Sequence, residues 1–370
     1  MSAAPGFAAQ DDELRFEVIN GVGVITLHRP QALNALTLGM LRALPGLLDA
    51  CERDTGIRAV LLRGAGPKAF CAGGDVLALS RSVAEGTPLH RQFFIDEYRL
   101  DHRLHHYPKP VIAFLHGIAM GGGMGLAQGA SLRLVTANSR LAMPEARIGL
   151  IPDVGATHFF ARMPAPLALY LALTGAQLNA ADAIFCGLAD ARSRLEQPEQ
   201  LDEALRDIVW VADTLADVRR ALCATRATSL DGATLPALCE AIYRHFDPAL
   251  PVMDIVESLS LESAPQHLAW ARDTLQTLRS RSPLMLSLCH EALRRGRRSA
   301  LAACFRMEFD VVQAALASGE FTEGVRAYLV DKDQQPRWRP ARLEEVSPQM
   351  VQRCFVTRED MPHPLADLVD

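Results

Sequence analysis

The chain has 370 residues, a formal net charge of −5 and a hydrophobic fraction of 49%, a composition typical of a soluble globular protein. No basic field is available to neutralise a phosphate backbone, which argues against nucleic acid as a main partner. The most apolar stretch, residues 111–127, is broken by His116 and several glycines. This interruption excludes a membrane-spanning helix there.

The N-terminal residues have neither a basic head followed by an apolar run nor the Arg-rich, acid-poor composition of a transit peptide. Eight cysteines are scattered between Cys51 and Cys354, without a CxxC pair or a regular spacing. We therefore expect a cytoplasmic protein with reduced thiols, and neither a disulfide framework nor a metal site.

The first predicted elements are a hairpin and a helix. Two β-prone runs in residues 14–27 flank Asn20 and Gly21, a dipeptide that tolerates the positive φ angles of a tight turn. Thr37 is a candidate N-cap, and the leucines that follow it recur at helical spacing. Pro45 falls inside this predicted helix and favours an interruption there.

Strand, loop and helix then recur three times within about a hundred residues, beginning with apolar strands predicted at 59–62, 111–115 and 132–136. This recurrence predicts an α/β fold of stacked β-β-α turns. The character changes after about residue 194 to helical segments rich in Leu, Ala, Arg and Glu. We place a boundary near residue 205, between a core of residues 12–205 and a mostly helical C-terminal region of residues 206–370.

Two of the predicted strands open into glycine-rich loops, CAGGD (Cys71–Asp75) and MGGGMG (Met120–Gly125). Glycines after a strand let the backbone approach a ligand and turn its N–H groups outward. Neither loop has the spacing of a P-loop or of a dinucleotide-binding fingerprint. Two convergent N–H groups can instead form an oxyanion hole, although a single such loop is more often only a turn.

Glu145 and Asp153 lie eight residues apart in the segment MPEARIGLIPDVG (Met143–Gly155). On a straight helix they would be about 12 Å apart, but Gly149 and Pro152 allow the segment to fold back. The alternatives are an N-cap for Asp153 and a first-turn acid for Glu145. No GxSxG elbow is present, so a serine hydrolase mechanism has no support.

The strings FCAGGD, HGIAMGGG and MPEARIGLIPDVG together resemble the crotonase (enoyl-CoA hydratase/isomerase) superfamily. The resemblance implies a spiral core of repeated β-β-α units, with the backbone N–H groups of Gly74 and Gly122 as the two donors of an oxyanion hole for an acyl-CoA thioester. Hydratases of this family carry a glutamate three residues after the second oxyanion glycine. Here that position is Gly125, so one hydratase carboxylate is missing.

Asp153 stands where hydratases usually have glycine, an exchange that resembles the 3-hydroxyisobutyryl-CoA hydrolase branch of the superfamily. The strings DEYRLDHRLHHYPKP (Asp96–Pro110) and FTEGVRAYLVDKDQQPRWRP (Phe321–Pro340) resemble the same branch. The resemblance implies that Glu145 and Asp153 form the catalytic pair and that Glu97 contacts the substrate. For Glu97 the alternative is a solvated helix charge.

By the same resemblance, CoA should bind as an extended substrate near Ala32 and Asn34 and beside Ala72, Gly73 and Asp75. The implied reaction hydrolyses a short hydroxyacyl-CoA to the free acid, in valine degradation. CoA is then part of the substrate, and the chemistry needs no metal or redox cofactor.

Two other functions remain open at this point. One is a crotonase-type hydratase, isomerase or decarboxylase acting on another acyl-CoA, and the other is a non-catalytic acyl-CoA-binding paralogue. Gly125 argues against hydration, and the presence of both Glu145 and Asp153 argues against the paralogue. Lys332 is a candidate contact for a CoA phosphate, with an exposed lysine as its alternative. Family members commonly form trimers, which makes a homo-oligomer the expected assembly.

Overall fold

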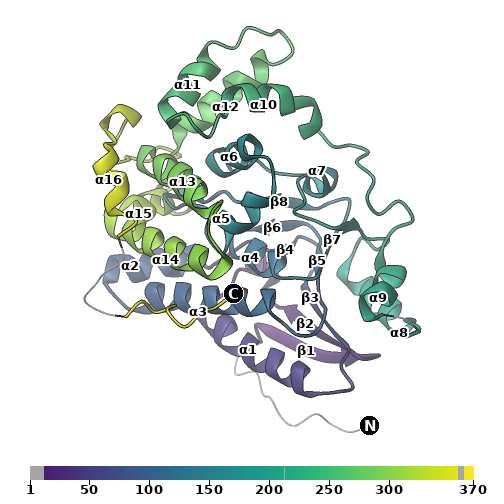
Figure 1. Ribbon diagram of the computed structural model, residues 1–370. Helices are drawn as coiled ribbons and strands as arrows, with labels where there is room; N and C mark the ends of the chain where they lie inside the picture. Colours follow the sequence, from purple (N-terminus) through teal and green to yellow (C-terminus); the bar gives the residue numbers. More distant parts are fainter. Residues whose placement is uncertain (1–11, 212, 357–361) are drawn as a thin grey trace.

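The computed structural model describes residues 12–211, 213–356 and 362–370. Within them, one sheet has the strand order β1-β2-β3-β5-β7-β9, and a second, smaller sheet has the order β4-β6-β8 (Figure 1). The strands are β1 (Leu14–Ile19), β2 (Val22–Leu27), β3 (Ala59–Gly64), β4 (Ala69–Cys71), β5 (Val111–Leu115), β6 (Ile118–Met120), β7 (Leu132–Val135), β8 (Arg140–Ala142) and β9 (Ala191–Arg192).

The α-helices surround these two sheets. They are α1 (Leu38–Arg53), α2 (Val76–Glu85), α3 (Leu89–His105), α4 (Gly122–Gln128), α5 (Ala156–Phe159), α6 (Ala165–Thr174), α7 (Ala180–Phe185), α8 (Leu201–Arg206), α9 (Thr214–Leu222), α10 (Cys239–His245), α11 (Val252–Ser260), α12 (Leu268–Ser280), α13 (Pro283–Gly296), α14 (Leu301–Ser318), α15 (Glu320–Val325) and α16 (Pro348–Arg353). None of the helices in the described part of the chain is long and apolar enough to cross a membrane.

The N-terminal hairpin and the helix after it confirm the sequence predictions. β1 and β2 pair antiparallel, and Asn20 and Gly21 adopt φ angles of 47° and 77°. The hydroxyl of Thr37 accepts a hydrogen bond from the Met40 N–H and so caps α1. The expected interruption at Pro45 is wrong, because α1 continues through it. Loss of one backbone hydrogen bond is offset by the buried leucine face of the helix.

The repeated β-β-α unit is visible in the strand pairing. β3, β5 and β7 run parallel in the large sheet, and the short strands that follow them, β4, β6 and β8, run parallel in the small sheet. Each turn of the chain therefore adds one strand to each sheet, which is the predicted spiral. This construction places the loops after β4 and β6 side by side, because both follow neighbouring strands of one sheet.

The C-terminal half is mostly helical, as the sequence predicted, and its parts lie in different places. α8 and α9 cover the outer face of the large sheet, where Leu205 and Leu222 are fully buried against strand residues such as Val24. α10, α11 and α12 group together at the top of Figure 1. α13, α14 and α15 instead pack beside α2, α3 and α5. The boundary near residue 205 stays a prediction, and it falls inside α8.

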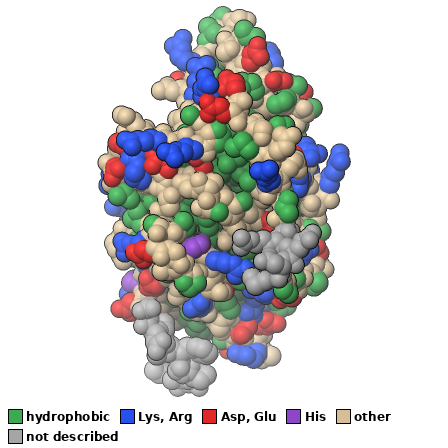
Figure 2. All heavy atoms as spheres, turned by 90° about the vertical axis from the view of Figure 1, so that its left-hand side faces the viewer, with side chains coloured by type: hydrophobic (Ala, Val, Ile, Leu, Met, Phe, Trp, Pro, Cys, Tyr) green, Lys and Arg blue, Asp and Glu red, His purple; other side chains and the backbone are tan. Residues whose placement is uncertain are grey.

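Acidic and basic side chains lie interspersed on the face that Figure 2 turns toward the viewer, without one large field of a single sign. This agrees with the small net charge of the sequence. This face therefore offers no extended electrostatic footprint for a nucleic acid, and the expected absence of a nucleic-acid partner stays a prediction.

Candidate active site

The two glycine loops touch. Gly73 has a φ angle of +100°, and a Cβ placed on it would lie 3.4 Å from the Gly122 nitrogen and 3.5 Å from the Gly121 Cα. Gly121 itself has a φ of 51°. Only glycine allows the two backbones to approach this closely in these conformations.

The N–H groups of Gly74 and Gly122 donate no hydrogen bond to any acceptor in the described part of the chain. Gly122 opens α4, so its N–H is one of the groups that a helix start leaves without an internal partner. Gly74 lies in the loop that passes directly against Gly122 through Gly73. The two N–H groups named from the sequence are therefore without a partner in the described residues, as the donors of an oxyanion hole must be before a ligand binds.

Glu145 and Asp153 are both buried, and the segment between them folds back as predicted. Glu145 begins a short 3-10 helix (Glu145–Ile148) that ends at Gly149 in the left-handed region. Glu145 Oε1 lies 3.0 Å from the point where a Cβ of Gly121 would stand, so the carboxyl faces the second glycine loop. The N-cap alternative for Asp153 is wrong, because its Oδ2 accepts a hydrogen bond of 2.6 Å from the Tyr98 hydroxyl and caps no helix.

The middle of α3 supplies two further buried carboxyls. Glu97 is 2% exposed, and its Oε1 fills the space where a Cβ of Gly122 would stand. The solvated-charge alternative for Glu97 is therefore wrong. Asp101, one helical turn later, is fully buried, and its Oδ2 lies 2.5 Å from the position of a Cβ on Gly125. A carboxyl from α3 thus occupies the region into which a hydratase glutamate at position 125 would project.

Crowding and burial disfavour the ionised forms of these acids. Burial raises the pKa of Glu97, Asp101 and Glu145 well above the ordinary value of a carboxyl, and neighbouring carboxylates raise each of them further. Burial also raises the pKa of Asp153, but only to about 6, because the hydrogen bond from Tyr98 favours its charged form. Asp153 is therefore the acid that ionises most readily in this group.

Three residues of this site were not identified from the sequence. Tyr98 and Asp101 lie in the quoted string DEYRLDHRL, and Asp101 is four residues after Glu97, a spacing that puts both on one helical face. That spacing could have identified Asp101 from the sequence as a neighbour of Glu97. Glu308 in α14 accepts hydrogen bonds from the residues just after Asp153, and nothing in the sequence near it indicates this role.

The loop expected to meet CoA is held by the side chains proposed to line it. The Asn34 amide donates to the carbonyls of Ala65 and Ala69 and accepts from the Arg29 N–H. Asp75 caps α2 and pairs with the Arg29 guanidinium at 3.1 Å. Both side chains are thus committed to loop structure, so their contact with CoA would be through the backbone.

Small residues line the rest of this loop pair. Ala32 and Ala72 are half-buried, and the Ala72 N–H donates to the Leu33 carbonyl at 3.0 Å. The Leu36 N–H donates in the opposite direction to the Gly73 carbonyl at 2.8 Å. These bonds fix the 32–36 segment to the first glycine loop.

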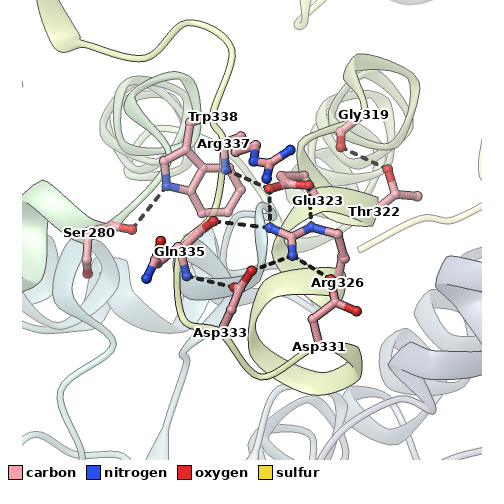
Figure 3. Close-up of polar contacts among 10 residues, drawn as sticks. All are labelled: Ser280, Gly319, Thr322, Glu323, Arg326, Asp331, Asp333, Gln335, Arg337 and Trp338. Carbon is pink, nitrogen blue, oxygen red and sulfur yellow. Dashed lines mark hydrogen bonds and ion pairs between the residues drawn. The ribbon is translucent and has the colours of Figure 1, made fainter.

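The segment after α15 forms a compact turn around Arg326 (Figure 3). The Arg326 guanidinium contacts the carboxylates of Glu323, Asp331 and Asp333 at 2.6 to 2.9 Å. Lys332, between the two aspartates, has a φ of 58° and an exposed side chain. Arg326 thus pairs with all three acids of this turn, and Lys332 points its charge toward solvent.

No group of three or more His, Cys, Asp or Glu side chains in the described residues is arranged to hold a metal ion. The expected absence of a cofactor stays a prediction. The chain belongs to the enoyl-CoA hydratase/isomerase family, whose family profile matches residues 22–355.

Individual relatives match nearly the whole chain. A protein of Danio rerio named 3-hydroxyisobutyryl-CoA hydrolase, mitochondrial, is 39% identical, and the match covers 94% of this chain and 90% of the relative. The 3-hydroxyisobutyryl-CoA hydrolase 1 of Arabidopsis thaliana is 36% identical, with 95% and 94% covered.

Solved structures of the same fold extend over the same length. A carnitinyl-CoA dehydratase from Mycobacterium thermoresistibile has a TM-score of 0.86 and 36% identity, covering 96% of this chain and 99% of its own. An enoyl-CoA hydratase from Rhodobacter sphaeroides has a TM-score of 0.81 and 34% identity, covering 93% and 97%. These neighbours confirm the crotonase fold.

The raised pKa of Asp101 leads to a prediction about stability. A carboxyl whose folded-state pKa exceeds its unfolded value contributes stability at low pH that is lost as the pH rises through the folded pKa. Asp101→Asn removes this loss, so its melting temperature relative to the parent should be higher at pH 9 than at pH 5. Thermal unfolding across this range is the measurement, with the exposed Asp207→Asn as control. A difference that does not change with pH would contradict the prediction.

The contact at Gly125 leads to a second prediction. In Gly125→Glu the new Cβ would lie 2.5 Å from Asp101 Oδ2 and 2.7 Å from the Val154 Cβ, and such overpacking costs about 1–3 kcal/mol. We expect lower thermal stability and no gain of hydration, measured by the absorbance of crotonyl-CoA. Gly125→Glu combined with Asp101→Ala should recover part of the lost stability. Hydration of crotonyl-CoA by the single variant would contradict this reading of the site.

Proposed function

We propose that this protein hydrolyses 3-hydroxyisobutyryl-CoA to 3-hydroxyisobutyrate and CoA. The observation that carries the proposal is the meeting of the Gly74 and Gly122 loops with the buried carboxyl of Glu145, whose pKa the buried Asp153 carboxyl raises. Similarity over nearly the whole chain to proteins named for this hydrolase supports the choice of substrate. We further propose a role in valine degradation.

In the proposed reaction, the N–H groups of Gly74 and Gly122 bind the thioester carbonyl oxygen and stabilise the negative charge that develops on it. Glu145 removes a proton from water, whose oxygen attacks the carbonyl carbon. The C–S bond then breaks, and the thiolate leaves with little assistance because its pKa is about 8.5. Direct attack by the Glu145 carboxylate, through a mixed anhydride, is the alternative. Transfer of ¹⁸O from water to Glu145 would identify it.

Asp153 and Glu97 are proposed to recognise the rest of the substrate. Glu97 fills the space beside Gly122 and is influenced by the Asp153 charge, and a buried hydrogen bond to a substrate hydroxyl discriminates strongly against acyl groups that lack one. Asp153, held by Tyr98, orients either this hydroxyl or the water. CoA is proposed to extend from this point along residues 32–36 and 72–75, with Lys332 near a phosphate.

The location and the assembly of the protein stay predictions. We expect a cytoplasmic protein, whereas the vertebrate relatives carry the word mitochondrial in their names. We also keep the homo-oligomer as the expected assembly. A substrate panel that includes 3-hydroxypropionyl-CoA would define the acyl specificity.

Removal of either catalytic carboxyl should abolish most of the activity. Glu145→Gln and Asp153→Asn are each expected to slow CoA release from 3-hydroxyisobutyryl-CoA by about 10²–10⁴-fold, the usual contribution of a general base. A thiol reagent reports the release. Asp182→Asn, which alters a buried carboxyl elsewhere in the fold, is the control and should keep its turnover. Unimpaired turnover in both site variants would remove this mechanism, and tight CoA binding without any turnover would favour a non-catalytic protein.

The pH dependence should reflect the two coupled acids. Protonation of Asp153 as the pH falls through about 6 should lower kcat on the acid side. Asp153 also raises the pKa of Glu145, so Asp153→Asn should shift the remaining acid limb to lower pH. Profiles of kcat for the parent and the variant would test this. An acid limb at the same pH in both proteins would contradict the coupling.

A further inference from the structure

The turn that carries Asp153 has a strained backbone. Val154, the next residue, has a φ of 53°, and Gly155 has a φ of 83°. A β-branched residue in the left-handed region costs about 1–3 kcal/mol and persists only where its surroundings impose it. Val154 is 1% exposed and packs against Gly125. Something beyond this packing must hold the next residues of the turn in place.

Glu308 of α14 supplies that restraint. Its Oε2 accepts a hydrogen bond of 2.7 Å from the Gly155 N–H, and its Oε1 accepts from the Thr157 N–H at 2.8 Å and from the Thr157 hydroxyl at 2.6 Å. Its side chain is fully buried. One carboxyl therefore accepts three hydrogen bonds from Gly155 and Thr157, the residues that join the Asp153 turn to the start of α5.

We propose that Glu308 is a positioning residue that fixes the Asp153 turn, so that the C-terminal helical region completes the catalytic site of the core. The inference rests on the proposed function, because it assigns Glu308 a role in placing a catalytic carboxyl. Glu308 has no contact with the glycine loops themselves, so its effect on the reaction passes through Asp153.

The choice of a carboxyl at position 308 supports positioning over simple packing. An apolar residue would fill the same space without burying another acid beside Asp153 and Asp101. Burial raises the pKa of Glu308 to about 8, and the hydrogen bonds from Thr157 and Gly155 work against this rise. The fold thus tolerates an unfavourable buried acid in exchange for three directed bonds to one turn.

The chain contains a matched control for this arrangement. Asp182 of α7 is also buried and also accepts three hydrogen bonds from one loop, from the Thr234 N–H, the Thr234 hydroxyl and the Leu235 N–H. That loop carries no residue of the candidate site. Asp182→Asn therefore disrupts a buried carboxyl that accepts three hydrogen bonds from one loop, as Glu308 does, without affecting Asp153.

The experiment compares Glu308→Ala, Glu308→Gln and Asp182→Asn in the full chain. Glu308→Ala should lower kcat for 3-hydroxyisobutyryl-CoA by about 10²-fold, the scale of a misplaced catalytic group, with a much smaller change in KM. Glu308→Gln keeps only part of the acceptor set, because its NH₂ group meets a backbone N–H, and it should fall between alanine and the parent. Asp182→Asn should lose thermal stability but keep its kcat.

A second measurement is independent of activity. Amide hydrogen exchange of peptides covering residues 150–160 should accelerate in Glu308→Ala and stay at the parent rate in Asp182→Asn. If Glu308→Ala does not fold, Thr157→Val removes one of the three bonds and should give a smaller loss of kcat and of exchange protection. Thr157→Ser should restore both.

The outcomes separate the two proposals. A parent protein that hydrolyses no thioester defeats the proposed function, while the exchange measurement still decides whether Glu308 holds the turn. An active parent with an unchanged kcat in Glu308→Ala overturns the positioning role. Unchanged amide exchange at residues 150–160 in that variant overturns the claim that Glu308 restrains the Asp153 turn. Equal kcat losses in Glu308→Ala and Asp182→Asn would reduce the effect to general destabilisation.

Discussion

The site depends on a concentration of buried carboxyls without a paired cation. Glu97, Asp101, Glu145, Asp153 and Glu308 are all at most 6% exposed, and within the described residues none of them forms a salt bridge with Lys, Arg or His. Burying several such charges together is unfavourable. The arrangement is stable only because most of the group can stay protonated and because fixed dipoles support the charge that remains. Tyr98 provides such a dipole for Asp153, and the N–H groups of the turn provide them for Glu308.

The spiral fold explains how this group assembles. Neighbouring strands of the small sheet end beside one another. The pairing of β4 with β6 is therefore enough to bring the two glycine loops together. α3 then crosses behind the second loop, and glycines at 122 and 125 leave the room that the carboxyls of Glu97 and Asp101 occupy. The two glycines therefore determine where the carboxyl groups of the site can lie. Side chains there would displace the acids.

Local patterns in the sequence were sufficient for several of the elements and for the contact between the two glycine loops of the candidate site. The Asn20-Gly21 turn, the Thr37 cap and the strand–glycine recurrences depend on residues close in the chain, and the structure has each of them. Pro45 misled because the cost of a proline depends on the packing of the whole helix. The role of Glu308 could not be predicted from the sequence for a different reason. Its hydrogen-bond partners lie more than 150 residues away in the chain, and no periodicity relates α14 to the Asp153 turn.

The order in which these acids ionise constrains the chemistry. Burial raises the pKa of Asp153 to about 6, and the Asp153 charge raises the pKa of Glu145 further, so Asp153 ionises before Glu145. Hydrolysis of a thioester needs one acceptor for the proton of water and makes little demand for a donor, since a thiolate leaves readily. Glu145 meets this demand once it is ionised, and its raised pKa makes it a stronger base than an ordinary carboxylate. Proton transfer from water then protonates Glu145, and loss of that proton to the departing thiolate or to solvent restores the base. A hydrogen bond from the substrate hydroxyl to Asp153 would stabilise the Asp153 charge and so keep Asp153 ionised while Glu145 acts as the base.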